Sequence, residues 1–267
     1  MCLLPKLTGK RVIVTVHGLD HQRAKWGRLA SAYIKRGEAC AVRHADEIIV
    51  LSRNTEQYFR RVYQRETRYL PNGICPAAKV PAQEIRSRWG LHEEAYILFL
   101  GRLVPEKGLS ILIDAFRQVD TDKKLVIAGS ASDTEAFVQD LRRQADGDGR
   151  ILFTGEVHGV IKEELYSNAY CYVLPSDLEG MPISLLEALS YGCCCLTSDI
   201  PECLELTRGY GASFRAGDAE SLRAELQALC NDTDRVRQYR EAAKDFPLED
   251  YDWDNITRKT IEFYYGK

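Results

Sequence analysis

The sequence of 267 residues has no apolar run that approaches the roughly 20 residues needed to span a bilayer. Its opening, Met-Cys-Leu-Leu-Pro, also lacks the apolar region of a secretory signal peptide. These absences predict a cytoplasmic protein without a membrane-spanning helix.

Cysteine is plentiful, with nine residues, but the patterns that usually give cysteine a role are missing. No Cys-x-x-Cys pair is present, so a zinc or thioredoxin-type site has no support. Cys193, Cys194 and Cys195 are consecutive in an apolar stretch, and neighbours on a strand point to opposite faces. This run does not fit a disulfide framework, so we expect reduced, buried thiols.

Several motifs of nucleotide binding and catalysis are absent as well. The sequence has no Gly-x-Gly-x-x-Gly after a strand, no Walker loop, no Gly-x-Ser-x-Gly elbow and no His-Glu-x-x-His. Nicotinamide, ATP and serine-hydrolase functions therefore lose their usual support. What is present is ordinary globular composition, 45% hydrophobic and 28% charged, in a chain long enough to bury a core.

Charge is unevenly distributed along the chain. The net charge is −3, yet residues 1–75 carry +8 and the remainder carries −11. Such asymmetry indicates two regions with different partners.

Short apolar runs alternate with helical patterns, which is typical of parallel strands covered by helices on both faces. We therefore predict an α/β fold with a doubly wound parallel sheet. The predicted strands are Arg11–His17, Glu47–Ser52, Thr67–Leu70, Tyr96–Gly101, Lys124–Ala128, Ile151–Thr154, Tyr170–Leu174 and Cys194–Ser198. The predicted helices are Gln22–His44, Asn54–Tyr63, Gly108–Val119, Asp133–Gln144, Ile161–Asn168 and Pro182–Tyr191, with others near 218–230, 233–244 and 253–265.

A break at Pro71-Asn72-Gly73, followed by a linker at Ala77–Pro81, predicts a domain boundary. We expect a first domain over 1–75, a second over 76–246, and a final helical segment over 247–267. The first domain offers only about three strands, fewer than the usual five or six. Either another chain completes this sheet or the sequence begins partway through a domain, and we favour the second interpretation.

The loop from Gly101 to Gly108 follows the predicted strand Tyr96–Gly101, and ligands of open α/β sheets bind beyond the carboxyl ends of strands. Arg102 leaves the strand, and Lys107 lies near the next helix start, where a cation opposes the helix dipole. Two converging cations suit a phosphate or diphosphate. The alternative is a pair of solvated loop cations.

A second loop, from Ser176 to Glu187, also follows a strand. The helix start formed by Gly180, Met181, Pro182 and Ile183 offers free amides to a phosphate. Glu187 lies one turn into the helix, where a carboxylate can accept two ribose hydroxyl groups, and Glu179 precedes the helix. The alternative is two exposed glutamates without a ligand.

Two further strand ends carry weaker signals. The loop with Val157 and Gly159 could seat the flat edge of a base. His17 ends the first apolar strand, where a histidine can act on a substrate hydroxyl or simply be hydrogen-bonded.

Taken together, these segments resemble the family 4 glycosyltransferases of GT-B fold, and rhamnosyltransferase-like bacterial polysaccharide enzymes in particular. The resemblance covers nearly the whole chain in ordered motifs. They are Thr15–Gly18, Pro71–Ile74, Gly101–Leu103 with Lys107-Gly108, Phe153–Gly155, Glu179 through Glu187 (the family's E-x7-E), Ser198–Glu202 and Tyr251–Trp253.

The resemblance implies roles for the candidate residues. The residues that match Arg102 and Lys107 hold the donor diphosphate, the match of Glu187 binds ribose, and the match of Glu179 faces the donor sugar. His17 matches a histidine near the donor sugar and the acceptor, and the loop of Val157 and Gly159 lies by the base.

The resemblance further implies a retaining enzyme that uses an NDP-sugar as co-substrate and needs no metal or other cofactor. The implied mechanism is front-face displacement, in which the leaving diphosphate helps to deprotonate a saccharide or lipid-linked acceptor. No nucleic-acid partner is expected.

One departure from the family concerns the beginning of the chain. The family has a full N-terminal Rossmann-like domain, of which residues 1–75 match only the end. We therefore expect a truncated chain that binds donor weakly and turns over poorly. The final helix is expected to cross back to the first domain.

The predicted helix Gln22–His44 adds a hypothesis about membranes. It carries Arg23, Lys25, Arg28, Lys35, Arg36 and Arg43, with Trp26, Leu29, Ala30 and Tyr33 on one side. Such a helix can rest peripherally on the anionic inner membrane face. The alternative is an ordinary helix with its Trp face in the core.

Two other functions stay open at this stage. A nucleotide-sugar epimerase could use the same fold. A non-catalytic binding subunit could obtain its missing half from another chain.

Overall fold

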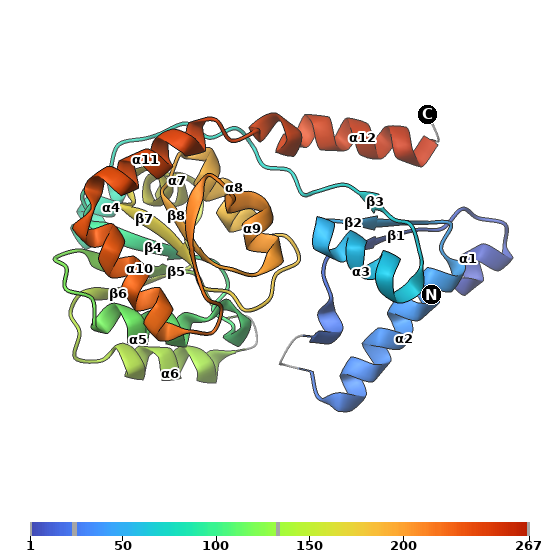
Figure 1. Ribbon diagram of the computed structural model, residues 1–267, viewed down its shortest axis with the longest axis horizontal. Helices are drawn as coiled ribbons and strands as arrows, with labels where there is room; N and C mark the ends of the chain where they lie inside the picture. Colours follow the sequence, from blue (N-terminus) through green and yellow to red (C-terminus); the bar gives the residue numbers. More distant parts are fainter. Residues whose placement is uncertain (1, 23–25, 132–133, 266–267) are drawn as a thin grey trace. The chain divides into compact units, whose positions relative to one another are not determined.

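The computed structural model describes residues 2–22, 26–131 and 134–265, which form two compact units (Figure 1). Unit 1 comprises Met1–Gly73, Leu178–Pro182 and Glu249–Lys267, and unit 2 comprises Ile74–Asp177 and Ile183–Leu248. None of the described helices is long and apolar enough to cross a membrane.

Unit 1 is built on a parallel sheet of three described strands in the order β1-β2-β3. Its core joins Ile48 and Val50 of the central strand to Phe59, Leu19 and Ala45. The strands are β1 (Ile13–Val16), β2 (Glu47–Val50) and β3 (Arg68–Tyr69), and the helices are α1 (Leu3–Leu7), α2 (Arg28–His44), α3 (Arg53–Tyr63) and α12 (Trp253–Tyr265).

Helix α3 shows why these local segments fold as they do. The Ser52 side chain accepts a hydrogen bond from the Thr55 amide at 3.2 Å, which is an N-cap. The helix ends at Tyr63, because the next residue, Gln64, has a left-handed backbone (φ 52°) that stops propagation.

Helix α2 begins later than predicted. A short 3-10 helix covers Asp20–Gln22, and Gly27 precedes α2 with an extended backbone (φ −66°, ψ 165°), so the predicted start at Gln22 is wrong. Arg23 and Lys25 of the predicted helix lie outside the described residues. The side chains of Leu29 and Tyr33 are 89% and 80% exposed, so the interpretation that this face packs into the core is also wrong.

The last helix, α12, belongs to unit 1. The Arg11 guanidinium donates to the carbonyl oxygen of Tyr264 at 2.6 Å and lies 5.6 Å from the Phe263 ring centroid. A β-carbon added to Gly73 would fall 2.6 Å from the Trp253 ring, so a glycine is needed where α12 begins. The final segment therefore completes the packing of unit 1.

Unit 2 is a parallel sheet in the order β6-β5-β4-β7-β8-β9, a doubly wound topology of Rossmann type. Helices α5, α6 and α10 cover one face, and α7, α8 and α9 cover the other (Figure 1). The strands are β4 (Tyr96–Leu100), β5 (Lys124–Ala128), β6 (Ile151–Gly155), β7 (Cys171–Leu174), β8 (Cys195–Ser198) and β9 (Gly211–Phe214). The helices are α4 (Glu84–Trp89), α5 (Leu109–Arg117), α6 (Glu135–Ala145), α7 (Gly159–Asn168), α8 (Ile183–Ser190), α9 (Pro201–Thr207), α10 (Ala219–Asn231) and α11 (Thr233–Lys244).

The nine cysteines are all free thiols, as expected from the sequence. Cys171, Cys203 and the run Cys193–Cys195 are buried, and burial raises the pKa of the Cys195 thiol well above its ordinary value. Cys75 is exposed, and Cys2, Cys40 and Cys230 are partly exposed, so full burial does not extend to every cysteine.

Helix α4 depends on a distant carboxylate. Glu164 of α7 is 2% exposed and accepts hydrogen bonds from the amides of Gln83, Glu84 and Ile85 at 3.0, 3.2 and 3.0 Å. These are amides that a helix start otherwise leaves without partners. The cap comes from a residue about 80 positions away, which local sequence cannot show.

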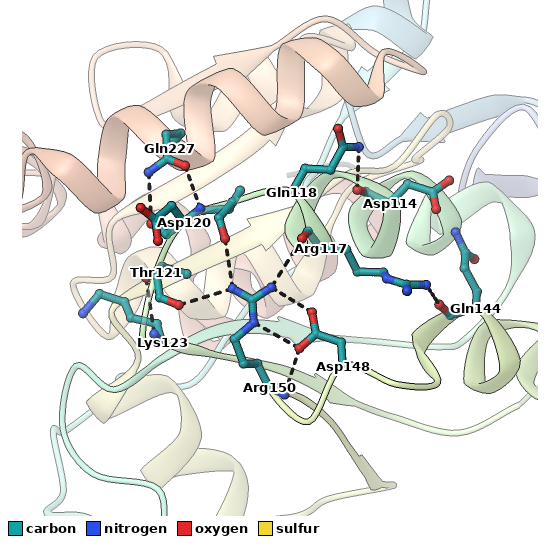
Figure 2. Close-up of polar contacts among 11 residues, drawn as sticks. Asp114, Arg117, Gln118, Asp120, Thr121, Lys123, Gln144, Asp148, Arg150 and Gln227 are labelled. Carbon is teal, nitrogen blue, oxygen red and sulfur yellow. Dashed lines mark hydrogen bonds and ion pairs between the residues drawn. The ribbon is translucent and has the colours of Figure 1, made fainter.

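A polar cluster joins the segments that enter β5 and β6 (Figure 2). Arg150 donates to the carbonyl oxygens of Val119 and Thr121 at 2.9 and 3.2 Å and forms two hydrogen bonds with the Asp148 carboxylate. Hydrogen bonding from Arg150 lowers the pKa of Asp148 below its ordinary value. The cluster lies where the strands begin, so its role is to hold the fold.

Candidate functional site

The strand order of unit 2 places a topological switch point between β4 and β7. Connections from β4 lead to β5 on one side, and β7 starts the other half of the sheet. A crevice forms at the carboxyl ends of strands where the winding reverses, and this is where doubly wound folds bind ligands. The two loops that the sequence singles out follow β4 and β7.

The loop after β4 is held by close backbone packing. Gly108 has a left-handed backbone (φ 65°), and an added β-carbon would lie 2.0 Å from the carbonyl oxygen of Pro175. The Asp177 amide donates to the carbonyl oxygen of Glu106 at 2.9 Å. The loops after β4 and β7 are therefore fastened together at the switch point.

The loop after β5 approaches the same place. A β-carbon on Gly129 would lie 1.8 Å from the carbonyl oxygen of Gly101, and the Leu103 amide donates to the Ser130 carbonyl at 2.9 Å. Glycines thus let backbone come close at each of these loops. The loops after β4, β5 and β7 are consequently in backbone contact with one another.

The two predicted diphosphate-binding cations lie on this framework. Arg102 is exposed just past β4, and Lys107 is the last residue of a 3-10 helix, Pro105–Lys107, that precedes α5. Both belong to the loop fastened to Pro175 and Asp177. The structure thus places both cations at the strand ends that the sequence predicted.

Glu187 is the fifth residue of α8, and two side chains contact its carboxylate. Lys162 Nζ lies 2.7 Å from Glu187 Oε1, and the Tyr166 hydroxyl lies 3.1 Å from Oε2. The side chains of Lys162 and Glu187 are 33% and 23% exposed. Sequence analysis missed both partners, because the contact depends on how α7 packs beside α8.

Packed tyrosine side chains surround the position of Glu187. The rings of Tyr166 and Tyr191 stack with centroids 5.4 Å apart and an interplanar angle of 13°. Burial raises the pKa of Tyr166 well above its ordinary value, so its hydroxyl keeps its proton. Tyr172 contributes a further hydrogen bond, to Ser184 Oγ at 2.8 Å. Ser184, Glu187 and Tyr191 therefore lie on one face that packs against Tyr166 and Tyr172.

The predicted base-binding residues differ in exposure. Val157 is buried at 9% exposure, whereas Gly159 is exposed and begins α7 with a left-handed backbone (φ 53°). No atom lies within 4 Å of a β-carbon added to Gly159, so main chain is accessible there. The same helix carries Lys162 one turn later, which links this loop to Glu187.

The remaining candidates belong to unit 1. His17 is exposed just past β1, and a β-carbon on Gly180 would lie 1.8 Å from the His17 carbonyl oxygen. Met181 Sδ accepts a hydrogen bond from the Asn72 amide at 3.0 Å. Pro182 precedes α8, which starts at Ile183, one residue later than predicted. The structure therefore brings the loop of Glu179 and Gly180 to the end of β1.

A cluster that sequence analysis missed supports the segment after His17. Glu38 Oε1 accepts hydrogen bonds from the hydroxyls of Tyr58 and Tyr63 at 2.8 and 2.6 Å. Glu38 Oε2 lies 3.3 Å from His21 Nδ1. Burial and the Glu38 carboxylate raise the pKa of Tyr63 to about 12, which keeps its hydroxyl a donor. Glu38 thus ties the 3-10 helix after β1 to α2 and α3.

The candidate residues form two groups, one in each unit. Arg102, Lys107 and Glu187 belong to unit 2, whereas His17 and Glu179 belong to unit 1. Across the described part of the chain, no group of three or more His, Cys, Asp or Glu side chains is placed to hold a metal ion.

Comparisons with known proteins match both units. The profile of the glycosyl transferases group 1 family matches residues 81–246, and that of Glycosyltransferase Family 4 matches residues 1–77. The chain is 27% identical to alpha-maltose-1-phosphate synthase of Mycolicibacterium smegmatis, covering 97% of this chain and 73% of that protein. It is 25% identical to a GDP-mannose-dependent alpha-(1-6)-phosphatidylinositol monomannoside mannosyltransferase of Mycobacterium tuberculosis, covering 96% and 70%.

Other curated relatives are matched over only about half of their length, 45% and 51% in two cases. The fold is similar to the crystal structure of Anabaena HepE in complex with UDP and glucose, with a TM-score of 0.87 and 18% identity. That match covers 100% of this chain and 74% of HepE. On the match of its profile to most of unit 2, this chain belongs to the group 1 glycosyltransferase family and has the GT-B type of α/β fold.

Proposed function

We propose that this chain transfers a sugar from an NDP-sugar donor to a saccharide or lipid-linked acceptor, with retention of anomeric configuration and without a metal or other cofactor. The observation that carries this proposal is that unit 2 has Arg102 and Lys107 in the loop after β4 and Glu187 on the helix after β7, the two strands that flank the switch point. A carboxylate suited to a diol and two cations suited to a diphosphate match the two polar parts of a nucleotide-sugar.

Arg102 and Lys107 are proposed to bind the donor diphosphate. The main-chain amides of the segment Gly180, Met181, Pro182 and Ile183 would add hydrogen bonds, with proline excepted because it has no N–H. These groups would stabilise the charge that develops as the diphosphate leaves. Glu187 is proposed to accept hydrogen bonds from the ribose hydroxyls.

His17 and Glu179 are proposed to act at the sugar and the acceptor. Their loops approach each other in unit 1, where Gly180 lies against the His17 carbonyl. In a front-face displacement, the leaving diphosphate takes the acceptor proton as the new glycosidic bond forms on the face from which the old one breaks. Glu179 would then orient the donor sugar, and His17 would bond a sugar or acceptor hydroxyl.

The loop of Val157 and Gly159 is proposed to border the base. The exposed main chain at Gly159 can hydrogen-bond a base edge, but it does not distinguish uracil from guanine. The solved structure of HepE holds UDP, and the mycobacterial mannosyltransferase is named for GDP-mannose. The test of this proposal therefore includes both a uracil and a guanine nucleotide.

The test begins with binding of UDP and GDP by calorimetry in buffer that contains EDTA. The chain is expected to bind at least one of them, and Glu187→Ala is expected to weaken that binding. Transfer is then measured with the matching NDP-sugars, and NMR of the anomeric proton distinguishes retention from inversion. If neither nucleotide binds, the proposal is wrong.

Product analysis also separates the proposal from its alternatives. A nucleotide-sugar epimerase would return a changed sugar without an acceptor. A non-catalytic subunit would bind the nucleotide, would release no product, and would co-elute with a partner chain.

A second proposal concerns α2. Leu29 and Tyr33 are exposed one turn apart, and Arg28, Lys35 and Arg36 are exposed on the same helix. Apolar side chains flanked by cations match an anionic lipid surface. We infer a cytoplasmic protein that contacts the inner membrane face peripherally, where a lipid-linked acceptor would lie.

A further inference from the structure

Among the described residues, the side-chain contacts of the Glu187 carboxylate come from one neighbouring helix, α7. Lys162 contacts one oxygen at 2.7 Å and Tyr166 contacts the other at 3.1 Å. The two donors are four residues apart, so they lie on the same face of α7. The helix thus presents a matched pair of donors to a single carboxylate on α8.

The two donors differ in burial and in packing. Tyr166 is 1% exposed, stacks on Tyr191, and its hydroxyl also lies 3.2 Å from the Ser184 carbonyl oxygen. Lys162 is 33% exposed and flexible, and it carries a full charge. Tyr166 therefore fixes the position of Glu187 Oε2. The contact between Lys162 and Oε1 then sets the rotation of the carboxylate.

The contacts leave acceptor capacity at Glu187. A carboxylate offers about four lone-pair positions, of which these two donors occupy one on each oxygen. Its side chain is 23% exposed, so the remaining positions are reachable from solvent. One free acceptor on each oxygen is the arrangement that a cis-diol needs.

We propose that Lys162 is a positioning residue for the ribose of the nucleotide. It holds the Glu187 carboxylate turned so that both oxygens face the 2′- and 3′-hydroxyls. This inference rests on the proposed role of Glu187 as the ribose ligand. Lys162 acts through Glu187 alone and makes no phosphate contact, in contrast to Arg102 and Lys107.

The proposal predicts an unusual signature for a cation near a nucleotide. Removing a phosphate-binding cation weakens binding in proportion to the phosphates present. Removing Lys162 weakens binding only when the ribose carries its hydroxyls. The probes are therefore UDP and 2′,3′-dideoxy-UDP, with GDP and its dideoxy analogue measured in parallel.

The experiment compares the whole chain with its Lys162→Met, Glu187→Gln and doubly substituted variants by calorimetry. Lys162→Met is expected to weaken binding of UDP or GDP about five- to tenfold and to leave the dideoxy analogue within about twofold. The double variant is expected to bind no more weakly than Glu187→Gln. Lys244→Met, which removes a lysine paired with Glu241 on α11, is the matched control for loss of charge.

Each outcome of these measurements supports or overturns the role of Lys162. An equal loss for the ribose and dideoxy forms overturns the inference, because a phosphate contact or a folding defect would produce it. So does a loss at Glu187→Gln with none at Lys162→Met. If the unsubstituted chain binds neither UDP nor GDP, the proposed function itself falls. Thermal unfolding of each variant, expected within a few degrees of the unsubstituted chain, separates misfolding from loss of binding.

Discussion

The carbonyl oxygen of Pro175 lies 2.0 Å from where a β-carbon on Gly108 would be. This contact closes the loop after β4 onto the loop after β7, at the switch point that carries Arg102 and Lys107. Gly90 provides a comparison, because it has nearly the same backbone (φ 63° against 65°) but no atom within 4 Å of an added β-carbon.

The two glycines therefore separate backbone strain from steric conflict. We expect Gly90→Ala to cost about 1 kcal/mol of unfolding free energy, from its left-handed backbone alone. Gly108→Ala is expected to cost at least about 2 kcal/mol more and to weaken nucleotide binding. Urea unfolding measures the first effect and calorimetry the second. Equal losses of unfolding free energy for the two substitutions would show that the Pro175 backbone can move away from the added β-carbon at little cost.

Arg102 and Lys107 are expected to recognise phosphate charge. Arg102→Ala or Lys107→Ala should weaken UDP or GDP binding at least about tenfold, with a smaller effect on the corresponding monophosphate. Arg223→Ala, which removes a partly exposed arginine paired with Glu220 on α10, is the control for charge. A variant that loses mono- and diphosphate affinity by the same factor would argue against the assignment.

Gly180 is expected to control the loop that carries Glu179. Gly180→Ala would place a β-carbon against the His17 carbonyl, so the loop must move. We expect sugar transfer to fall at least about tenfold and nucleotide binding to weaken by a smaller factor, because the displaced loop carries Glu179 as well as some of the amides proposed for the diphosphate. Gly149→Ala, which meets no atom within 4 Å, is the matched control. Full transfer activity in Gly180→Ala would remove the loop from the mechanism.

The Asp148–Arg150 contact should make stability depend on pH. The pKa of Asp148 is lowered in the fold from its ordinary 3.8, so its stabilisation is complete above about pH 4 and is lost as pH falls through the folded pKa. Asp148→Asn is expected to cost about 1–2 kcal/mol at pH 7, and the difference from the unsubstituted chain should shrink below pH 4.

Urea unfolding at pH 7.0, about 4.5 and about 3.5 follows this difference. Glu220→Gln, which breaks the exposed pair with Arg223, is the control and should change stability little. A difference that is the same at each pH would mean that Asp148 contributes through packing rather than through its charge.

The exposed face of α2 is expected to bind vesicles that contain anionic lipid and not to bind vesicles of neutral lipid. Replacing both Leu29 and Tyr33 by serine should weaken binding at least about tenfold, because both side chains would otherwise leave water. Val62→Ser on α3, which changes a valine that is 45% exposed, tests whether any surface apolar residue suffices. Failure of the unsubstituted chain to sediment with anionic vesicles would end this proposal.

Much of the unit 2 sheet could be predicted because its strands are apolar runs bounded by turn residues. The run Lys124–Ala128 matches β5 at both ends, and β4 and β6 differ by one residue. Helix α9 and strand β9 were missed because they are short and neither has a strong period. Helix α4 was missed because the carboxylate of Glu164 caps it from a distant part of the chain.

The site residues also divide into those that the sequence could predict and those that it could not. The positions of Arg102, Lys107 and Glu187 follow from strand ends, which the sequence marks clearly. The partners Lys162 and Tyr166 depend on how α7 packs beside α8, and no pattern within either helix specifies that contact. The late start of α2 follows from the extended backbone at Gly27, a conformation that many residues can adopt.

Unit 1 gathers three stretches of chain, Met1–Gly73, Leu178–Pro182 and Glu249–Lys267, around an otherwise continuous unit 2. This interleaving constrains how relatives can trade parts during evolution. A single genetic crossover cannot exchange one unit intact, because the final helix and the Glu179 loop would be inherited with the other. A hybrid in which unit 2 is exchanged between two relatives needs two crossovers. It must also keep a loop at residues 178–182 that fits the end of the first strand in the protein that supplies unit 1.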